Sequence, residues 1–307
     1  MKPLKLTAVL VTAALFAMPA LAQVSTLEKM RTTGKLTMGV RDGSVPLSYT
    51  LGDGKYVGFH IDICQQIINA ARRKLNLGMV EVGYQLVSSQ NRIPLVQNGT
   101  VDLECGSTTN NVARQKDVAF AVTTYIEEVR MAVRADSGIT SISQLNGKTV
   151  VTTTGTTSVQ HLRKHKRAAG LDFKEIQGKD HQDSFLLLET GRADAYVIDG
   201  AMLASLIATS KTPKNFAVVG EVLNVEPIAI MMRKDDTELK KIADETIKSM
   251  AASGALRDLW TKWYLKPIPP KGVAIGLQTP ESIKAAWAKP NDKPMEDYQA
   301  APVAAKP

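Results

Sequence analysis

Hydroxyl side chains and arginines gather at three places where an expected strand passes into an expected helix. Backbone N–H groups at a helix start are unpaired, and the helix dipole favours negative charge there. Ligands of α/β sheets also bind beyond the carboxyl ends of strands. One such corner would be an ordinary helix N-cap, but three together, with Arg92 and Arg114 beside them, predict a site for a small anion. The three corners are residues 88–92, 106–114 and 154–158.

Motifs typical of enzymes and metal sites are largely missing. Gly147, Lys148 and Thr149 resemble the end of a P-loop, but Ile142 stands where the loop requires glycine. The GxSxG and HExxH motifs are absent. His161 and His165 have a spacing that could seat a metal, but Lys and Arg lie between them and no carboxylate is near in sequence. We therefore expect no enzyme activity, no metal and no cofactor.

The first 22 residues have the pattern of a secretory signal peptide. Lys2 and Lys5 precede an apolar stretch at 6–18, and Ala-Leu-Ala at 20–22 is a small-residue cleavage site. No Cys follows the cleavage site, and no later stretch approaches 18 uninterrupted apolar residues. The sequence therefore predicts a free periplasmic protein.

The composition is that of an ordinary globular protein, with 307 residues of which 44% are hydrophobic and 22% charged. The net charge of +8 is spread over the chain, and its densest run, at 163–167, has no zinc-finger, RNP or helix-turn-helix signature beside it. We expect a solvated helix face there and no nucleic-acid partner. Cys64 and Cys105 could form one disulfide in the periplasm or remain buried thiols, because a sequence does not give the Cα separation that a bridge requires.

Expected strands and helices alternate along most of the chain, which indicates an α/β architecture with a largely parallel core. Apolar residues recur at helical spacing over 59–76, which predicts an amphipathic helix packed on a sheet. The last 18 residues, 290–307, contain four prolines and little apolar periodicity, so we expect a disordered tail. The other expected strands are 35–40, 80–87, 101–105, 147–155, 173–178, 193–200, 216–221 and 227–233. The other expected helices are 27–34, 92–98, 157–170, 183–193, 201–210, 236–254 and 255–265.

Four stretches resemble the periplasmic glutamate/aspartate-binding proteins of ABC importers, within the polar amino acid-binding family. The resemblance runs from about Thr26 to Asp292 and is carried by SSQNRIPLVQNGTVDLECGSTTNNVARQ, VVTTTGTTS, KDHQDSF and WYLKPIPPK. It implies the two-lobed type II periplasmic binding protein fold, in which two α/β lobes are joined by two crossing strands, here near 122–133 and 213–224. Lobe 1 would then comprise 23–127 and 219–289, and lobe 2 would comprise 128–218.

The resemblance also implies a set of ligand-binding residues. Planar guanidinium groups bind carboxylates bidentately, and a carboxylate is the natural acceptor for an ammonium group. Asp199 could instead cap the next helix, His181 could lie on a surface loop, and Arg41 could only pair with Asp42. By resemblance, Arg114, Ser107, Thr109 and Thr157 would bind the ligand α-carboxylate, Asp199 the α-ammonium group, and Arg41, Ser89, Arg92 and His181 the side-chain carboxylate.

Two departures from the family pattern bear on selectivity. His60 follows Gly58 and Phe59, where the family usually has an acidic residue, and Glu127 and Glu128 lie in the first crossing strand. A buried glutamate near the cleft would disfavour an anionic side chain and shift preference toward glutamine or asparagine.

The resemblance predicts a non-enzymatic periplasmic solute-binding protein, a monomer that captures L-glutamate or L-aspartate and delivers it to an inner-membrane ABC permease. Binding of glutamine, asparagine or another polar amino acid, a dehydratase-like or hydrolytic enzyme on the same scaffold, and a sensor that docks on a membrane receptor stay open as alternatives.

Overall fold

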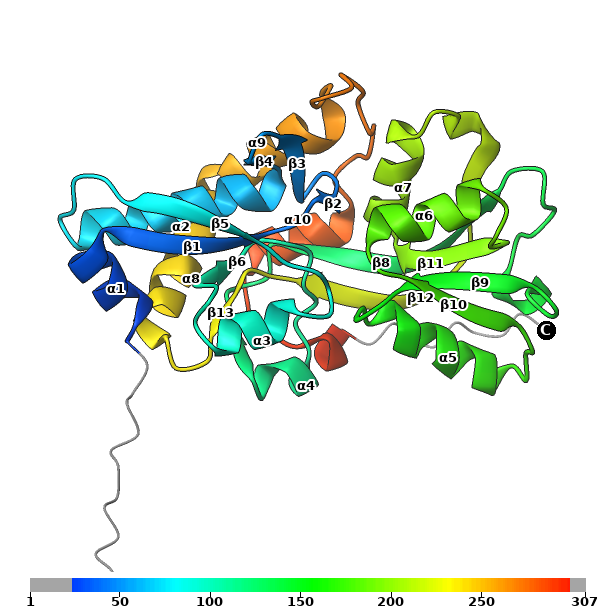
Figure 1. Ribbon diagram of the computed structural model, residues 1–307, viewed down its shortest axis with the longest axis horizontal. Coiled ribbons are helices and arrows are strands. Elements are labelled where there is room, and N and C mark those ends of the chain that lie inside the picture. Colours follow the sequence, from blue (N-terminus) through cyan, green and yellow to red (C-terminus); the bar gives the residue numbers. More distant parts are fainter. Residues whose placement is uncertain (1–23, 299–307) are drawn as a thin grey trace, which may run out of the picture.

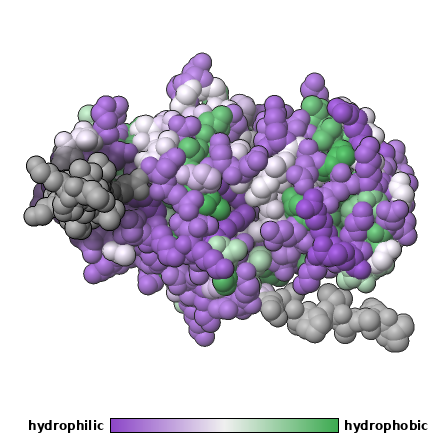
Figure 2. Space-filling view, turned by 60° about the horizontal axis from the view of Figure 1, so that its bottom comes forward, coloured by the Kyte–Doolittle hydropathy of each residue, from purple (hydrophilic) through white to green (hydrophobic). Residues whose placement is uncertain are grey.

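The chain forms two lobes, each built on its own five-stranded sheet (Figure 1). The computed structural model describes residues 24–298, so the predicted signal peptide at 1–22 lies outside the described residues. No helix in the described part of the chain is long and apolar enough to cross a membrane. The face of the molecule in Figure 2 is largely hydrophilic, with hydrophobic residues in small separate patches.

Lobe 1 carries the sheet β5-β1-β6-β13-β7. Strand β1 pairs in parallel with β5 and β6, whereas β13 pairs antiparallel with β6 and β7. A small hairpin sheet, β2-β3-β4, follows β1. The strands are β1 (Lys35–Val40), β2 (Gly43–Ser44), β3 (Ser48–Gly52), β4 (Lys55–Val57), β5 (Glu81–Leu86), β6 (Leu103–Glu104), β7 (Val118–Phe120) and β13 (Met231–Arg233), and the helices are α1 (Thr26–Thr33), α2 (Phe59–Lys74), α3 (Arg92–Gln97), α4 (Val112–Gln115), α8 (Thr237–Ser253), α9 (Ala255–Trp260) and α10 (Glu281–Ala288).

Lobe 2 carries the sheet β10-β9-β11-β8-β12. Helices α6 and α7 lie above this sheet in the view of Figure 1, and α5 lies below it. The expected parallel pairing holds for β9, β10 and β11, but β8 and β12 run antiparallel, so both sheets are mixed. The elements are β8 (Tyr125–Arg134), β9 (Thr149–Thr153), β10 (Lys174–Gly178), β11 (Ala195–Asp199), β12 (Phe216–Ile228), α5 (Ser158–Ala168), α6 (His181–Glu189) and α7 (Gly200–Thr209), with short 3-10 turns at Ile142–Gln144 and Pro213–Asn215.

Strands β8 and β12 cross between the lobes and confirm the expected two-strand connection (Figure 1). The two strands pair antiparallel on either side of an irregularity in β12 between Val219 and Asn224. The two strands expected at 216–221 and 227–233 were wrong in one respect: β12 is a single strand to Ile228, and β13 starts only at Met231. The pattern of hydrophobic residues does not show where β12 ends, because that pattern continues where the chain passes from the sheet of lobe 2 to the sheet of lobe 1. The lobe boundaries expected at 127 and 219 fall inside these two strands and stay predictions.

The core of lobe 1 forms where the amphipathic helix α2 packs on its sheet, as its spacing predicts. Ile63, Cys64 and Ile67 on this helix have no exposed surface. Cys64 forms a disulfide with Cys105, which follows β6, so of the two alternatives the bridge is present. The disulfide therefore attaches α2 to the chain just ahead of the expected corner at 106–114.

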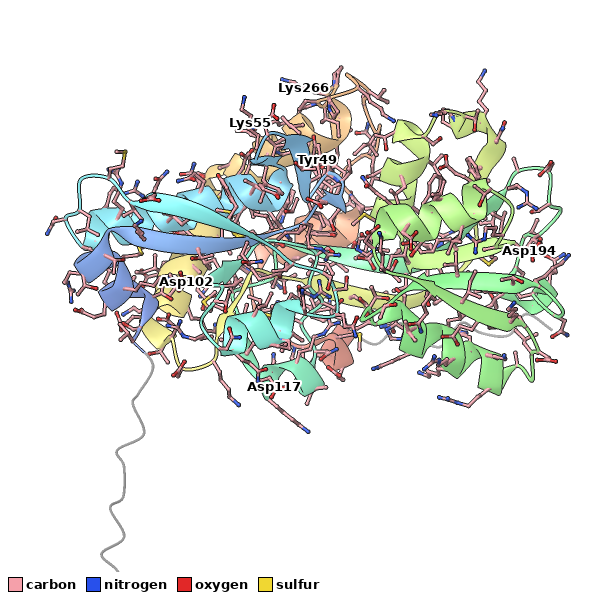
Figure 3. All side chains as sticks on the ribbon, viewed as in Figure 1. Tyr49, Lys55, Asp102, Asp117, Asp194 and Lys266 are labelled. Atoms are coloured by element: carbon pink, nitrogen blue, oxygen red, sulfur yellow. A yellow bond between two sulfur atoms is a disulfide. The ribbon has the colours of Figure 1, made fainter. Side chains whose placement is uncertain are left out.

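Two aspartates, Asp102, which is buried, and Asp194, which is partly buried, occupy equivalent positions in the two lobes (Figure 3). Asp102 precedes β6 and accepts a hydrogen bond of 2.7 Å from the backbone N of Thr37 in β1. Asp194 precedes β11 and accepts one of 2.8 Å from the backbone N of Thr149 in β9. Each carboxylate therefore fixes the register of a central parallel strand pair, and with it the strand ends that carry the site.

The chain after α10 is ordered, so the disordered tail expected from 290 is wrong for residues 290–298. The backbone N of Met295 donates to the carbonyl of Asn110 at 2.8 Å, and that of Thr123 donates to Asn291 at 2.8 Å. Asp292 also forms an ion pair with Lys240 at 2.9 Å. A proline-rich composition argues against a helix or a regular strand. It does not show whether an extended segment is held by hydrogen bonds to distant parts of the chain, as this one is. Residues 299–307 lie outside the described residues.

Candidate functional site

The nine predicted ligand-binding residues come together between the two lobes. Six lie in lobe 1, beyond the ends of β1, β5 and β6, and three lie in lobe 2, at the ends of β9, β10 and β11. All except Arg114 are buried, with side chains no more than 6% exposed. The lobes are in contact here, since a Cβ on Gly155 of lobe 2 would lie 2.7 Å from the backbone of Gln90 in lobe 1.

Arg41, Ser89 and His181 lie together at one end of the candidate site. Arg41 Nη2 donates to Ser89 Oγ at 3.0 Å and lies 3.5 Å from Nε2 of His181. The other ring nitrogen of His181 lies 3.2 Å from Thr153 Oγ1. Burial, together with the nearby Arg41 and Arg92, places the pKa of His181 well below its ordinary value, so the ring is neutral. The alternatives of a surface histidine and an Arg41–Asp42 pair are therefore wrong.

Two guanidinium groups at this end have unused donors. Arg92 is 2% exposed, and its Nε and Nη1 have no hydrogen-bond partner among the described residues. Nη1 of Arg41 likewise has none within residues 24–298. Burial and the neighbouring Arg92 lower the pKa of Arg41 to about 10, which leaves it cationic at neutral pH. Because unsatisfied buried charges are costly, this end of the site is suited to an anion.

Arg114 and two threonines form the other end of the site. Arg114 Nη1 donates to the carbonyl of Thr109 at 2.8 Å, and its Nη2 donates to the carbonyl of Gly155 in lobe 2 at 3.4 Å. Burial and Arg92 lower the pKa of Arg114 to about 10, so it stays cationic. The hydroxyls of Thr109 and Thr157 lie 3.4 Å apart across the two lobes. Ser107 lies in the same loop and is 6% exposed.

Asp199 lies at the end of β11, directly before α7, and is 6% exposed. It occupies the N-cap position of that helix, as the alternative held, but its side chain makes no capping hydrogen bond there. Burial and the neighbouring Glu226 raise the pKa of Asp199 to about 7, against the opposite effect of Arg92 and Arg114. A carboxylate with this pKa gains from a cationic partner.

Glu226 is a residue of the site that sequence reasoning missed. It lies in the crossing strand β12, has no exposed surface, and accepts hydrogen bonds from both Thr109 and Thr157. Its other carboxylate oxygen lies 2.7 Å from His161 Nε2. Glu226 lies between the strands expected at 216–221 and 227–233, so no expected element marked it.

A further buried carboxylate, Glu104 in β6, lies behind the arginines. It accepts a hydrogen bond of 2.6 Å from Thr108 Oγ1. A Cβ on Gly106 would lie 2.2 Å from Glu104 Oε1 and 3.0 Å from the Arg41 side chain. A larger residue at this position would therefore displace the Glu104 carboxylate and press on the Arg41 side chain.

His60, one of the two departures from the family pattern, supports the same loop. Its Nδ1 contacts the carbonyl of Gly106, and its Nε2 lies 2.8 Å from Thr124 Oγ1. Burial lowers the pKa of His60 to about 4, although the bond to Gly106 acts in the opposite direction. A carbonyl only accepts, so the neutral ring carries its proton on Nδ1.

The glutamates of the first crossing strand do not place a full negative charge against the arginine end. Glu127 accepts hydrogen bonds from the backbone N of Glu128 and Ala201, and it lines a cavity of about 270 Å³ beside Trp260 and Ile283. Burial and the nearby Asp199 raise the pKa of Glu127 well above its ordinary value, which favours its neutral form. Glu128 is 51% exposed and lies 3.6 Å from Arg130. The expected shift toward glutamine finds no support in this geometry.

The arginine end of the site adjoins a second cavity of about 260 Å³, lined by residues of both lobes, among them Arg41, Ser88, Lys179 and His181. The described residues contain no group of three or more His, Cys, Asp or Glu side chains that could hold a metal ion. His161 contacts Glu226, and His165 contacts the carbonyl of Leu223, so the two histidines of α5 do not converge. The site is thus an arrangement of charges and hydrogen-bond donors for a small polar molecule.

The comparisons with known proteins define the class to which this chain belongs. Residues 36–266 match the model of the bacterial extracellular solute-binding proteins, family 3. The chain belongs to this family, and its fold is that of the type II periplasmic amino acid-binding proteins.

Two curated relatives are similar over most of the chain. The chain is 41% identical over 290 residues to the L-glutamate/L-aspartate-binding protein of Pseudomonas aeruginosa, covering 93% of this chain and 96% of the relative. It is 41% identical over 269 residues to the glutamate/aspartate import solute-binding protein of Escherichia coli K12, covering 88% and 89%. Among solved structures, an ancestral arginine-binding protein bound to arginine matches with a TM-score of 0.66 and 29% identity, over 75% of this chain and 98% of the other.

Proposed function

We propose that this protein binds L-glutamate or L-aspartate in the periplasm and delivers it to the inner-membrane permease of an ABC importer. The observation that carries this proposal is the pair of buried arginines with unused donors, Arg41 and Arg92, in a site that also contains the cation of Arg114. An amino acid with an anionic side chain has one carboxylate for each end. The predicted signal peptide and the names of the two relatives support the location and the transport role.

The proposed orientation of the ligand follows from the charges. The α-carboxylate lies at Arg114, near Ser107, Thr109 and Thr157, and the α-ammonium group lies at Asp199. The side-chain carboxylate lies between Arg41 and Arg92, with Ser89 beside it. These assignments satisfy the donors that the described residues leave unpaired, and they give Asp199 the cation that its raised pKa favours.

The state of His181 supports an acidic rather than an amide side chain. The ring is neutral and its Nε2 faces the guanidinium group of Arg41 at 3.5 Å, so it orients Arg41 without adding charge. The arginine end therefore offers donors from cationic groups, and a carboxylate makes stronger hydrogen bonds with such donors than a neutral amide does. We accordingly propose that acidic amino acids bind more tightly than glutamine and asparagine.

We further propose that the protein acts as a monomer and does not change its ligand chemically. A titration calorimetry screen of the twenty L-amino acids, followed by mass spectrometry of the ligand recovered after long incubation, tests both the ligand and the absence of turnover. We expect binding of glutamate and aspartate, with the ligand recovered unchanged. At about 100 times Kd the folded protein should gain roughly 2.7 kcal/mol of stability.

The screen has clear contrary outcomes. Dehydrated or hydrolysed ligand that accumulates in proportion to protein concentration would establish an enzyme. Absence of heat and of any melting shift with all twenty amino acids would exclude the proposed ligands. As a control, Glu81→Gln changes an exposed surface ion pair with Lys35 and should bind like the unmodified protein.

A further inference from the structure

Glu226 lies where the two lobes meet the hinge. It is in the crossing strand β12, directly opposite Glu127 of the crossing strand β8. Its Oε2 accepts a hydrogen bond of 2.6 Å from Thr109 of lobe 1 and one of 2.9 Å from Thr157 of lobe 2. Its Oε1 lies 2.7 Å from Nε2 of His161, also in lobe 2. One buried carboxylate thus joins both lobes and the hinge.

The chemistry of these contacts conflicts with the simplest assignment of the two threonines. A hydroxyl has one proton to donate. When the hydroxyls of Thr109 and Thr157 donate to Glu226, they present only lone pairs to a ligand carboxylate, which accepts and does not donate. The two side chains therefore cannot serve Glu226 and the α-carboxylate of a ligand at the same time.

An ionised carboxylate suits the position of Glu226. Two hydroxyls and an imidazole converge on it, and an ionised carboxylate accepts at both oxygens. A glutamine would keep an accepting oxygen for the hydroxyls, but it would make neutral hydrogen bonds in place of charge-assisted ones and would need Nε2 of the imidazole to accept from its amide. Burial alone would raise the pKa of Glu226, but the hydrogen bonds from His161, Thr109 and Thr157 outweigh it and lower the pKa below its ordinary value. The ionised form is the one that these contacts favour.

We propose that Glu226 is the positioning residue that holds the two lobes closed, and that the hydroxyls of Thr109 and Thr157 donate to Glu226 rather than to the α-carboxylate of the ligand. This inference rests on the proposed function and deepens it, because it states what keeps the ligand enclosed. The α-carboxylate is then bound by Arg114, and the threonine side chains retain the ligand by retaining the closed form.

Glu226→Gln tests this proposal, with Glu128→Gln as the matched control because Glu128 is an exposed glutamate on the neighbouring crossing strand. Stopped-flow fluorescence would measure association and dissociation of glutamate, and small-angle X-ray scattering would measure the radius of gyration. We expect Glu226→Gln to release glutamate at least tenfold faster, with association changed less than twofold, because the lobes join after the encounter. The ratio of glutamate to glutamine affinity should stay unchanged, and the ligand-free radius of gyration should increase.

A second pair of variants keeps the test decisive if Glu226→Gln does not fold. Thr157→Val removes the hydroxyl and should expand the ligand-free protein, whereas Thr157→Ser keeps it and should restore the unmodified behaviour. In the background of Glu226→Gln, Thr157→Val should cost little further affinity, because both changes weaken the same contact between Thr157 and residue 226.

Three outcomes would overturn the proposal. They are unchanged dissociation in Glu226→Gln, fully additive losses in the double variant, and a Thr157→Val variant as compact as the unmodified protein. The scattering measurement needs no ligand. Failure of glutamate to bind the unmodified protein would therefore reject the proposed function while still testing the closure of the lobes.

Discussion

Arg92 and Arg114 both lie in short helices of lobe 1, yet their guanidinium groups are used in different ways. Arg114 donates to carbonyls of both lobes, those of Thr109 and Gly155. Arg92 is more deeply buried, and within residues 24–298 two of its nitrogens have no partner. Under the proposed function, Arg114 would both link the lobes and bind the ligand, whereas the unpaired donors of Arg92 would be used only by the ligand. Loss of Arg114 should thus affect every ligand, and loss of Arg92 only some.

The largest effect is expected for Arg114→Ala. This change leaves the α-carboxylate without its cation and also removes the link to lobe 2, so affinity should fall by about 2–5 kcal/mol for all amino acids that bind. Arg114→Lys should also bind poorly, since a point charge does not reproduce a bidentate fork. Titration calorimetry with glutamate, aspartate and glutamine measures the losses. Near-normal affinity in the alanine variant would remove Arg114 from the site.

A smaller and selective effect is expected for Arg92→Ala. The glutamate-to-glutamine affinity ratio should fall by about 2 kcal/mol, or about thirtyfold, because the neutral amide depends less on the guanidinium group than the carboxylate does. Arg41→Ala and the double variant should fall in the same direction. Arg31→Ala is the control, since that arginine is 59% exposed on α1. An unchanged ratio in all three variants would place the side-chain pocket elsewhere.

The smallest effect concerns Asp199, whose carboxylate interacts with both arginines. Its pKa is raised to about 7, so it is partly protonated in the ligand-free protein at neutral pH. A ligand ammonium group favours the ionised form, and binding below pH 7 must therefore release a proton. Affinity should be constant above pH 8 and should fall about tenfold, or 1.4 kcal/mol, by pH 6.

Calorimetry in buffers of different ionisation enthalpy would count the protons released at pH 6. Asp199→Asn should bind weakly and should lose this pH dependence, because it has no group that titrates there. Proton release that persists in Asp199→Asn would assign the effect to another residue and would separate Asp199 from the ammonium group.

The sequence was sufficient to predict the features that local patterns encode. Strand-to-helix corners follow from hydrophobic periodicity and from hydroxyl residues at helix starts, and these placed Ser89, Arg92, Thr109 and Thr157 beyond the strand ends. The resemblance then assigned a place in the site to residues such as His181, which no local pattern in its polar stretch would have marked. The amphipathic spacing of α2 likewise predicted its buried face.

The features that sequence reasoning missed depend on chain segments that are far apart. Glu226 meets Thr109 across 117 residues and Thr157 across 69, and nothing near Glu226 in sequence indicates these partners. In the same way, the sequence could not decide whether Cys64 and Cys105 form a disulfide, because only the fold determines the distance between their Cα atoms. Pairing of β12 with β8 also extends past the irregularity after Val219, where local hydrophobicity suggested a break.

The segment after α10 has a practical consequence for anyone who wishes to convert this protein into an optical reporter of amino acids. Asn110, beside the α-carboxylate end of the site, is held by Met295 through its carbonyl and by Asp292 through its side chain. A fluorescent domain joined at residue 289 would remove these contacts and loosen the loop that carries Thr109. One joined after Tyr298 would leave the loop fixed, so its brightness would report closure of the lobes rather than damage to the site.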